Sequence, residues 1–142
     1  MVYEVRIQGV DEAARNIANA GAFAVAAQLE LAHDFGSRVQ AAVRGRSTGR
    51  PGPNRISGDY IDSIKYLVQN TAGGYEAVVY SEAPQSMRLE LGFYGTDSLG
   101  RTYAVGPFPH FGPAYQEQYP RYVAAQAALA AQVAAVGNGG AG

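Results

Sequence analysis

The segment from Arg88 to Tyr115, RLELGFYGTDSLGRTYAVGPFPHFGPAY, constrains the fold more than any other part of the chain. Its glycines and prolines interrupt any sustained repeat of two or 3.6 residues, so it predicts neither a long helix nor a long strand. It is too rich in Phe, Tyr and Leu for a solvated linker, because disordered segments are poor in these residues. A long, irregular, apolar segment must be buried against its own core or against a neighbouring subunit. We therefore expect a protein that assembles with other chains.

Length and charge exclude several classes of protein. The 142 residues predict a single domain over residues 1–136, followed by a flexible tail at 137–142. Eleven Lys and Arg against twelve Asp and Glu leave a net charge of -1, which gives no general attraction to nucleic acid or to an anionic membrane. The uncharged stretch 122–142 is mostly Ala and Gly with interspersed Gln, too weakly apolar to insert into a membrane. Since the N-terminus also lacks the apolar core of a signal peptide, we expect a soluble protein.

The first half of the chain predicts a strand, a long helix and a loop. Residues 2–8 alternate between apolar and polar side chains, as in a half-buried strand. Apolar residues then recur at steps of three or four from Glu12 to about Val43, which predicts a helix. Gly and Pro in residues 44–58 predict a loop.

The second half predicts a hairpin and a final helix. A short capped turn in SGDYIDSI leads into a strand at 64–69, and a Gly-containing turn at 71–74 joins it to a second strand at 75–80. Pro113 opens a last helix that runs to about Val136, and Pro120 is expected to kink or divide it. The predicted fold class is α+β: a long N-terminal helix and a C-terminal helix packed on a small antiparallel sheet, with a long irregular Gly/Pro/aromatic segment.

Few side chains are available for catalysis or metal binding. The chain has no Cys, and its two histidines, His33 and His110, lie far apart in unlike contexts. A surface or interface position is the favoured interpretation for His33, and a packed or interface position for His110. We therefore expect no enzyme activity, no cofactor and no metal.

The loop after the long helix carries four arginines that meet no acidic residue until Asp59. One interpretation is a solvated, disordered loop. The other is a flexible basic finger that contacts an acidic partner or DNA phosphates without reading sequence. The residues of this basic loop are Arg44, Arg46, Arg50 and Arg55.

Three short segments, taken in order, resemble the small head–tail joining proteins of long-tailed bacteriophages, also called tail-completion or minor tail proteins. SGDYIDSI (57–64) resembles that family's Thr/Ser-Gly-x-Leu-x-x-Ser-Ile signature. APQSMRLELG (83–92) is similar to its segment ending in Glu-x-Gly, and GPFPHFGPAY (106–115) to its Pro-x-Pro-aromatic and Pro-Ala element. The similarity extends over residues 10–136. The chain departs from many relatives at Phe93, where they place Thr.

The resemblance implies a structural virion protein of the phage neck, made in the host cytoplasm, that forms part of a homo-oligomeric ring. Its partners would be neck and tail proteins: the connector or stopper, the tail terminator and the tail tube. Nonspecific contact with packaged DNA is also possible in this setting. One alternative is a tail terminator that caps the tube, and an alternative of another class is a small nonspecific nucleic-acid-binding protein.

Large side chains within the irregular segment are the expected subunit interface, since interfaces concentrate their energy in a few aromatic and Arg anchors. The two charged residues among them lie two positions apart and would form a pair at the rim. The alternative is that the segment folds back onto the hairpin as core. The expected interface residues are Arg88, Leu89, Glu90, Leu91, Phe93, Tyr94, Phe108 and Phe111.

Overall fold

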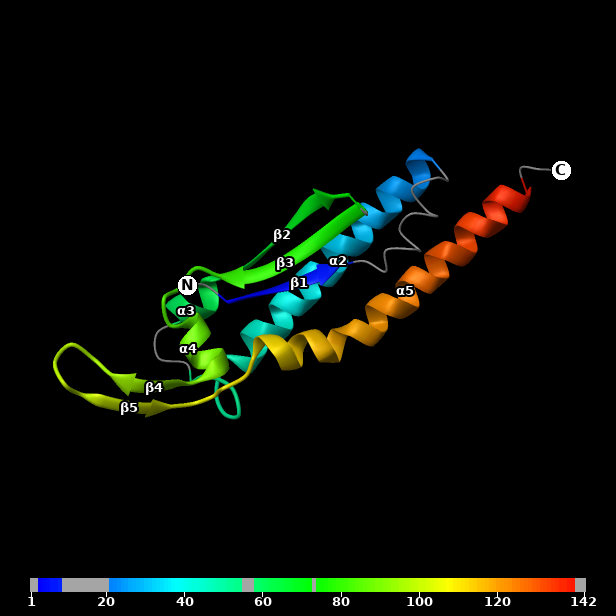
Figure 1. Cartoon of the computed structure of the whole chain (residues 1–142). Coiled ribbons are helices and arrows are strands. Elements are labelled where there is room, and N and C mark those ends of the chain that lie inside the picture. The colour runs from blue at the N-terminus through cyan, green and yellow to red at the C-terminus, as the bar shows by residue number, and fades with distance from the viewer. Residues whose placement is uncertain (1–2, 9–20, 55–57, 73, 140–142) are drawn as a thin grey trace.

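The computed structural model describes residues 3–8, 21–54, 58–72 and 74–139. Two long helices lie beside a three-stranded sheet, and a separate two-stranded hairpin extends from one end of the molecule (Figure 1). The fold class is α+β, as the sequence predicts. Within the described residues, no helix is both long and apolar enough to span a bilayer.

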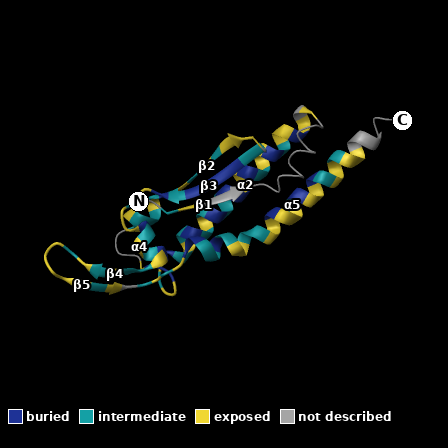
Figure 2. Cartoon of the chain, viewed as in Figure 1, coloured by how far each residue is buried: buried dark blue, intermediate teal, exposed yellow. Residues whose placement is uncertain are grey.

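The three-stranded sheet is antiparallel throughout. Its central strand β3 (Gly74–Ser81) lies between β1 (Glu4–Gln8) and β2 (Ile64–Thr71). The predicted first strand and the predicted hairpin are both confirmed, and the hairpin register extends from Ile64 opposite Ser81 to Thr71 opposite Gly74. Residues 76–79 of this central strand are all buried, and the strand is largely dark blue in Figure 2.

Helix α2 (Ala22–Arg46) covers the sheet with a stripe of apolar residues four positions apart. Phe35, Val39 and Val43 on this stripe are buried against Ile64 of β2 and Val79 of β3. The stripe therefore confirms the predicted helix from Ala22, whereas Gly21 is not helical, and α2 continues to Arg46 instead of ending near Val43. The predicted beginning at Glu12 lies outside the described residues.

Helix α5 (Phe111–Gly139) packs along α2. Tyr122 stacks on Phe35 with 4.5 Å between ring centroids, and Leu129 is buried against Ala24 near the far end of the pair. The helix begins two residues before Pro113 and extends beyond the predicted end near Val136. It is continuous through Pro120, and it bends where its colour turns from gold to orange in Figure 1.

The segment expected to be irregular consists mainly of short regular elements. Helix α4 (Ser86–Leu91) precedes a hairpin of β4 (Phe93–Thr96) and β5 (Thr102–Val105). We call residues 93–105 the arm. It points away from the sheet and the long helices (Figure 1). The segment is therefore neither one long helix nor one long strand, as predicted, and its four- to six-residue elements are too short to establish a detectable period.

Candidate functional site

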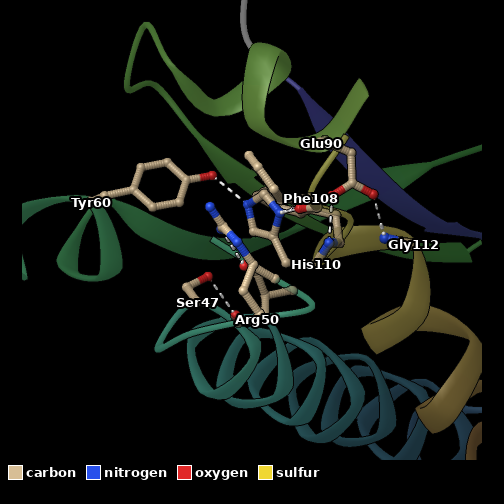
Figure 3. Close-up of polar contacts among 10 residues, drawn as sticks. Ser47, Arg50, Tyr60, Glu90, Phe108, His110 and Gly112 are labelled. Carbon is tan, nitrogen blue, oxygen red and sulfur yellow. Dashed lines mark hydrogen bonds and ion pairs between the residues drawn. The ribbon is translucent and has the colours of Figure 1, made fainter. Parts of the chain in front are cut away.

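The carboxylate of Glu90 connects the two chain segments that flank the arm, which we call the root of the arm. One oxygen accepts the backbone N–H groups of His110 at 2.7 Å and Phe111 at 3.0 Å, and the other accepts that of Gly112 at 2.9 Å (Figure 3). These N–H groups lie at the beginning of α5, where a helix has no internal acceptors for them and favours negative charge. The backbone N–H of Phe108 also donates to the carbonyl of Leu89 at 2.7 Å. We call these contacts the clasp.

The clasp determines the ionisation of Glu90. Burial alone would raise its pKa, but hydrogen bonds from the His110 side chain and from three backbone N–H groups outweigh burial and lower the pKa to about 2. Glu90 is therefore a buried anion at neutral pH. This corrects the prediction that Glu90 pairs with Arg88 at an interface rim. Arg88 instead lies over the ring of Phe93, with 4.2 Å between guanidinium carbon and ring centroid.

Buried His110 connects the clasp to Tyr60 of α3 (Asp59–Asp62). Its Nδ1 lies 2.9 Å from the carbonyl oxygen of Phe108 and 3.0 Å from a carboxylate oxygen of Glu90. Both are acceptors, so Nδ1 carries the proton of the tautomer in which Nε2 accepts from the Tyr60 hydroxyl at 2.5 Å (Figure 3). The packed position of His110 agrees with the favoured interpretation of the sequence.

The Tyr60 hydroxyl is held in its protonated form. Burial, followed by the negative charge of Glu90, raises its pKa well above the usual value. The three side chains thus form a line of hydrogen bonds in which the phenol is a donor. This arrangement fixes α3, α4 and the beginning of α5 relative to one another.

A pocket of about 490 Å³ opens beside this line of hydrogen bonds. We call it the root pocket. Tyr60 and Ile61 of α3 line it together with Leu89 and Phe108, which precede and follow the arm in the sequence. Arg50 also lines the pocket, and its guanidinium carbon lies 3.6 Å from the centroid of the Phe108 ring (Figure 3).

The turn between β4 and β5 is built around Asp97. Its carboxylate accepts the backbone N–H groups of Leu99 and Arg101 at 2.9 Å each, the Nε–H of Arg101 at 2.6 Å and the hydroxyl of Tyr103 at 3.0 Å. These bonds lower the pKa of Asp97, the backbone bond from Arg101 contributing most. Leu99 projects from this ordered turn with 76% of its surface exposed.

The structure separates the expected interface residues into two groups. Phe111 is fully buried in the core and Glu90 in the clasp, so neither belongs to an exposed surface, and this corrects their assignment. Leu91 and Tyr94 are 58% and 70% exposed. The half-buried or exposed members that remain accessible are Arg88, Leu89, Leu91, Phe93, Tyr94 and Phe108.

The basic loop is less free than the sequence predicts. Arg44 and Arg46 are the last turn of α2: Arg44 donates to the carbonyl of Ile64, and Arg46 pairs with Glu117 at 2.8 Å. Arg50 donates to the carbonyl of Gly52 in addition to covering Phe108. Arg55 lies outside the described residues. The acidic partner of Arg46 thus comes from α5, more than seventy positions away, because the sequence of the loop itself holds no acidic residue before Asp59.

Sequence reasoning missed Tyr60, Asp97 and Leu99. Only the turn carried a usable signal, because Asp97 and Gly100 are the residues favoured at the first and fourth positions of a type I turn. The described residues hold no group of three or more His, Asp or Glu side chains that could bind a metal. The chain matches no protein-family model, no curated protein and no solved structure.

Proposed function

We propose that this chain is a structural subunit of a bacteriophage neck, where copies of it form a ring that joins the head connector to the tail. The ordered set of three sequence segments suggests the neck. The observation that carries the proposal of assembly is the arm, which projects from the body with apolar side chains in solvent.

The arm has the features of an assembly contact. Its two strands pair with each other and with no further strand among the described residues, so its apolar side chains lie outside the main core. Exposed apolar side chains gather at and beside it: Leu91 at its root, Tyr94 on β4 and Leu99 in its turn. Grouped exposure of this kind is typical of surfaces that another protein covers. In a ring of identical subunits, each subunit has a neighbour that can cover this surface.

DNA binding receives no comparable support. Among the described arginines of the basic loop, Arg46 is paired with Glu117, while Arg44 and Arg50 are held by backbone carbonyls within the subunit and do not project as a flexible finger. The proposed partners remain the other neck and tail proteins: connector or stopper, tail terminator and tail tube.

Two measurements test the proposal. Native mass spectrometry and negative-stain electron microscopy of the purified chain at increasing concentration are expected to show a closed ring. In the phage that encodes the chain, particles made without it are expected to accumulate as filled heads and separate tails. Complete infectious particles without the chain, or a chain that stays monomeric alone and with neck proteins, would contradict the proposal.

A further inference from the structure

The turn of the arm is ordered before any partner binds. Two of the four hydrogen bonds to the Asp97 carboxylate come from the backbone N–H groups of Leu99 and Arg101 and fix the backbone of the turn, and the other two come from side chains. A solvated loop does not require such order, and it gains nothing from a leucine that is 76% exposed. For a binding element both features are favourable, because a preordered loop loses little conformational freedom when it docks.

The root pocket provides a matching cavity in the same chain. Ile61, Leu89 and Phe108 give it apolar walls, and its volume of about 490 Å³ exceeds what one leucine side chain fills. It opens at the surface beside the clasp, which holds its walls in place. The pocket therefore suits an apolar side chain carried on a wider element such as a turn.

The arm cannot fill the pocket of its own subunit. Leu89 and Phe108 flank the arm, so the pocket lies at its root. From Phe93 to Thr96 the strand takes three steps of about 3.3 Å, so the turn begins roughly 10 Å from that root, on strands that point away from the body (Figure 1). The turn of one copy can therefore enter only the pocket of another copy.

The charges around the two surfaces are complementary. The pocket is bordered by Asp59 and by the guanidinium of Arg50. The turn carries Arg101, whose side chain is 64% exposed, next to the carboxylate of Asp97. A turn that enters the pocket would bring the Asp97 carboxylate toward the Arg50 guanidinium, an attraction of opposite charges that favours the contact.

We propose that the arm of one copy inserts Leu99 into the root pocket of the next copy, an inference that rests on the ring proposed above. The two surfaces are different patches of the same chain, so the contact is heterologous and repeats from subunit to subunit until the ring closes. Each contact between neighbouring subunits thus consists of the arm of one copy and the root pocket of the next.

Disulfide trapping tests this contact directly, because the chain has no native cysteine. Leu99→Cys is combined in one chain with Gln85→Cys or with Asn54→Cys, two positions that line the pocket. Oxidation of the assembled protein is expected to give a ladder of cross-linked species up to the full ring. The matched control combines Leu99→Cys with Lys65→Cys, an exposed position on β2, and should give no ladder.

A charge substitution provides the second test. Leu99→Glu is expected to raise the concentration of half-assembly at least tenfold, a factor on the order of that from burying one leucine. Ser98→Glu adds the same charge at the neighbouring exposed position, and it should have a much smaller effect. Unchanged thermal unfolding of both variants would verify that the subunit still folds.

The outcomes separate the two proposals. A ring without a ladder from either pocket position, or a ring that tolerates Leu99→Glu, overturns the arm-to-pocket contact and leaves the neck function standing. A chain that forms no oligomer under any condition overturns both.

Discussion

The side chains of Gln28 and Gln126 exchange two hydrogen bonds across the buried contact between α2 and α5. Nε2 of Gln28 donates to Oε1 of Gln126 at 2.7 Å, and Nε2 of Gln126 donates back at 2.9 Å. Each amide satisfies the other in a place with little water, and the Tyr122 hydroxyl accepts a further bond from Gln126 at 2.9 Å. The pair fixes the relative position of the two long helices, because a shift of either one would leave both amides unpaired.

Replacement of one glutamine should lower the free energy of unfolding by more than half of the loss that replacement of both produces. Gln28→Leu leaves the amide of Gln126 without its partner, and we expect a loss of about 1–3 kcal/mol in the free energy of unfolding. Urea denaturation of Gln28→Leu, Gln126→Leu and the double variant measures this. Strictly additive losses would show that the two amides act independently.

Glu90 should make the fold sensitive to acid. Its pKa is lowered from 4.5 to about 2, so its contribution to stability is fully present above pH 4.5 and is lost as the pH falls from there toward 2. The contribution is roughly 3 kcal/mol. Urea denaturation between pH 7 and pH 2.5 should show Glu90→Gln less stable at neutral pH and the difference shrinking in acid. Glu117→Gln removes an exposed carboxylate and serves as the control, with an expected change of about 1 kcal/mol or less.

Substitution of two glycines of α2 by alanine should change the stability of the fold in opposite directions. A Cβ at Gly36 would lie 2.7 Å from a ring carbon of Tyr66 and 3.3 Å from the Cβ of Ala77, so helix and sheet would have to separate. We expect a loss of about 1–3 kcal/mol, larger than the gain in helix propensity. A Cβ at Gly45 meets nothing within 4 Å, so Gly45→Ala should stabilise by about 0.5–1 kcal/mol. Melting temperatures of the two variants that change in the same direction would contradict this account.

The hydroxyl of Tyr60 should matter more than that of an exposed tyrosine. Tyr60→Phe leaves Nε2 of buried His110 without its donor, at an expected cost of about 1–3 kcal/mol. Tyr94→Phe removes a 3.2 Å bond to the Gly106 carbonyl on an exposed residue and should change stability by less than about 0.5 kcal/mol. Equal losses in the free energy of unfolding of the two variants, measured by chemical denaturation, would show that the Tyr60–His110 bond stabilises the fold no more than the exposed bond does.

Local periodicity was sufficient to predict most of the main framework. The alternation before Gly9, the four-residue spacing of Phe35, Val39 and Val43, and the glycine turn before Tyr75 each belong to an element long enough to display its repeat. Packing of these elements then follows from their apolar faces.

The contacts of the candidate site depend on residues far apart in the sequence. Glu90 binds backbone groups about twenty positions later, and Tyr60 meets His110 fifty positions later. No local pattern reports such pairs, so sequence reasoning placed Glu90 at a surface and treated Phe111 as a possible contact. The arm escaped detection for another reason: its strands have four residues each, and the glycines at its root hide their alternation.

At the base of the arm, Gly92 and Gly106 approach so closely that a Cβ on Gly106 would lie 3.2 Å from the Cα of Gly92. The two ends of the arm therefore lie side by side where they join the body, and the hydrogen bonds of the clasp hold the adjoining backbone together. Apart from the contact of Arg88 with Phe93 and a hydrogen bond to Gly106, the contacts described for the arm lie within it, so its turn can change in length or sequence with little effect on the sheet and the long helices. The arm can therefore vary in sequence as an independent module while the scaffold of sheet and long helices stays unchanged.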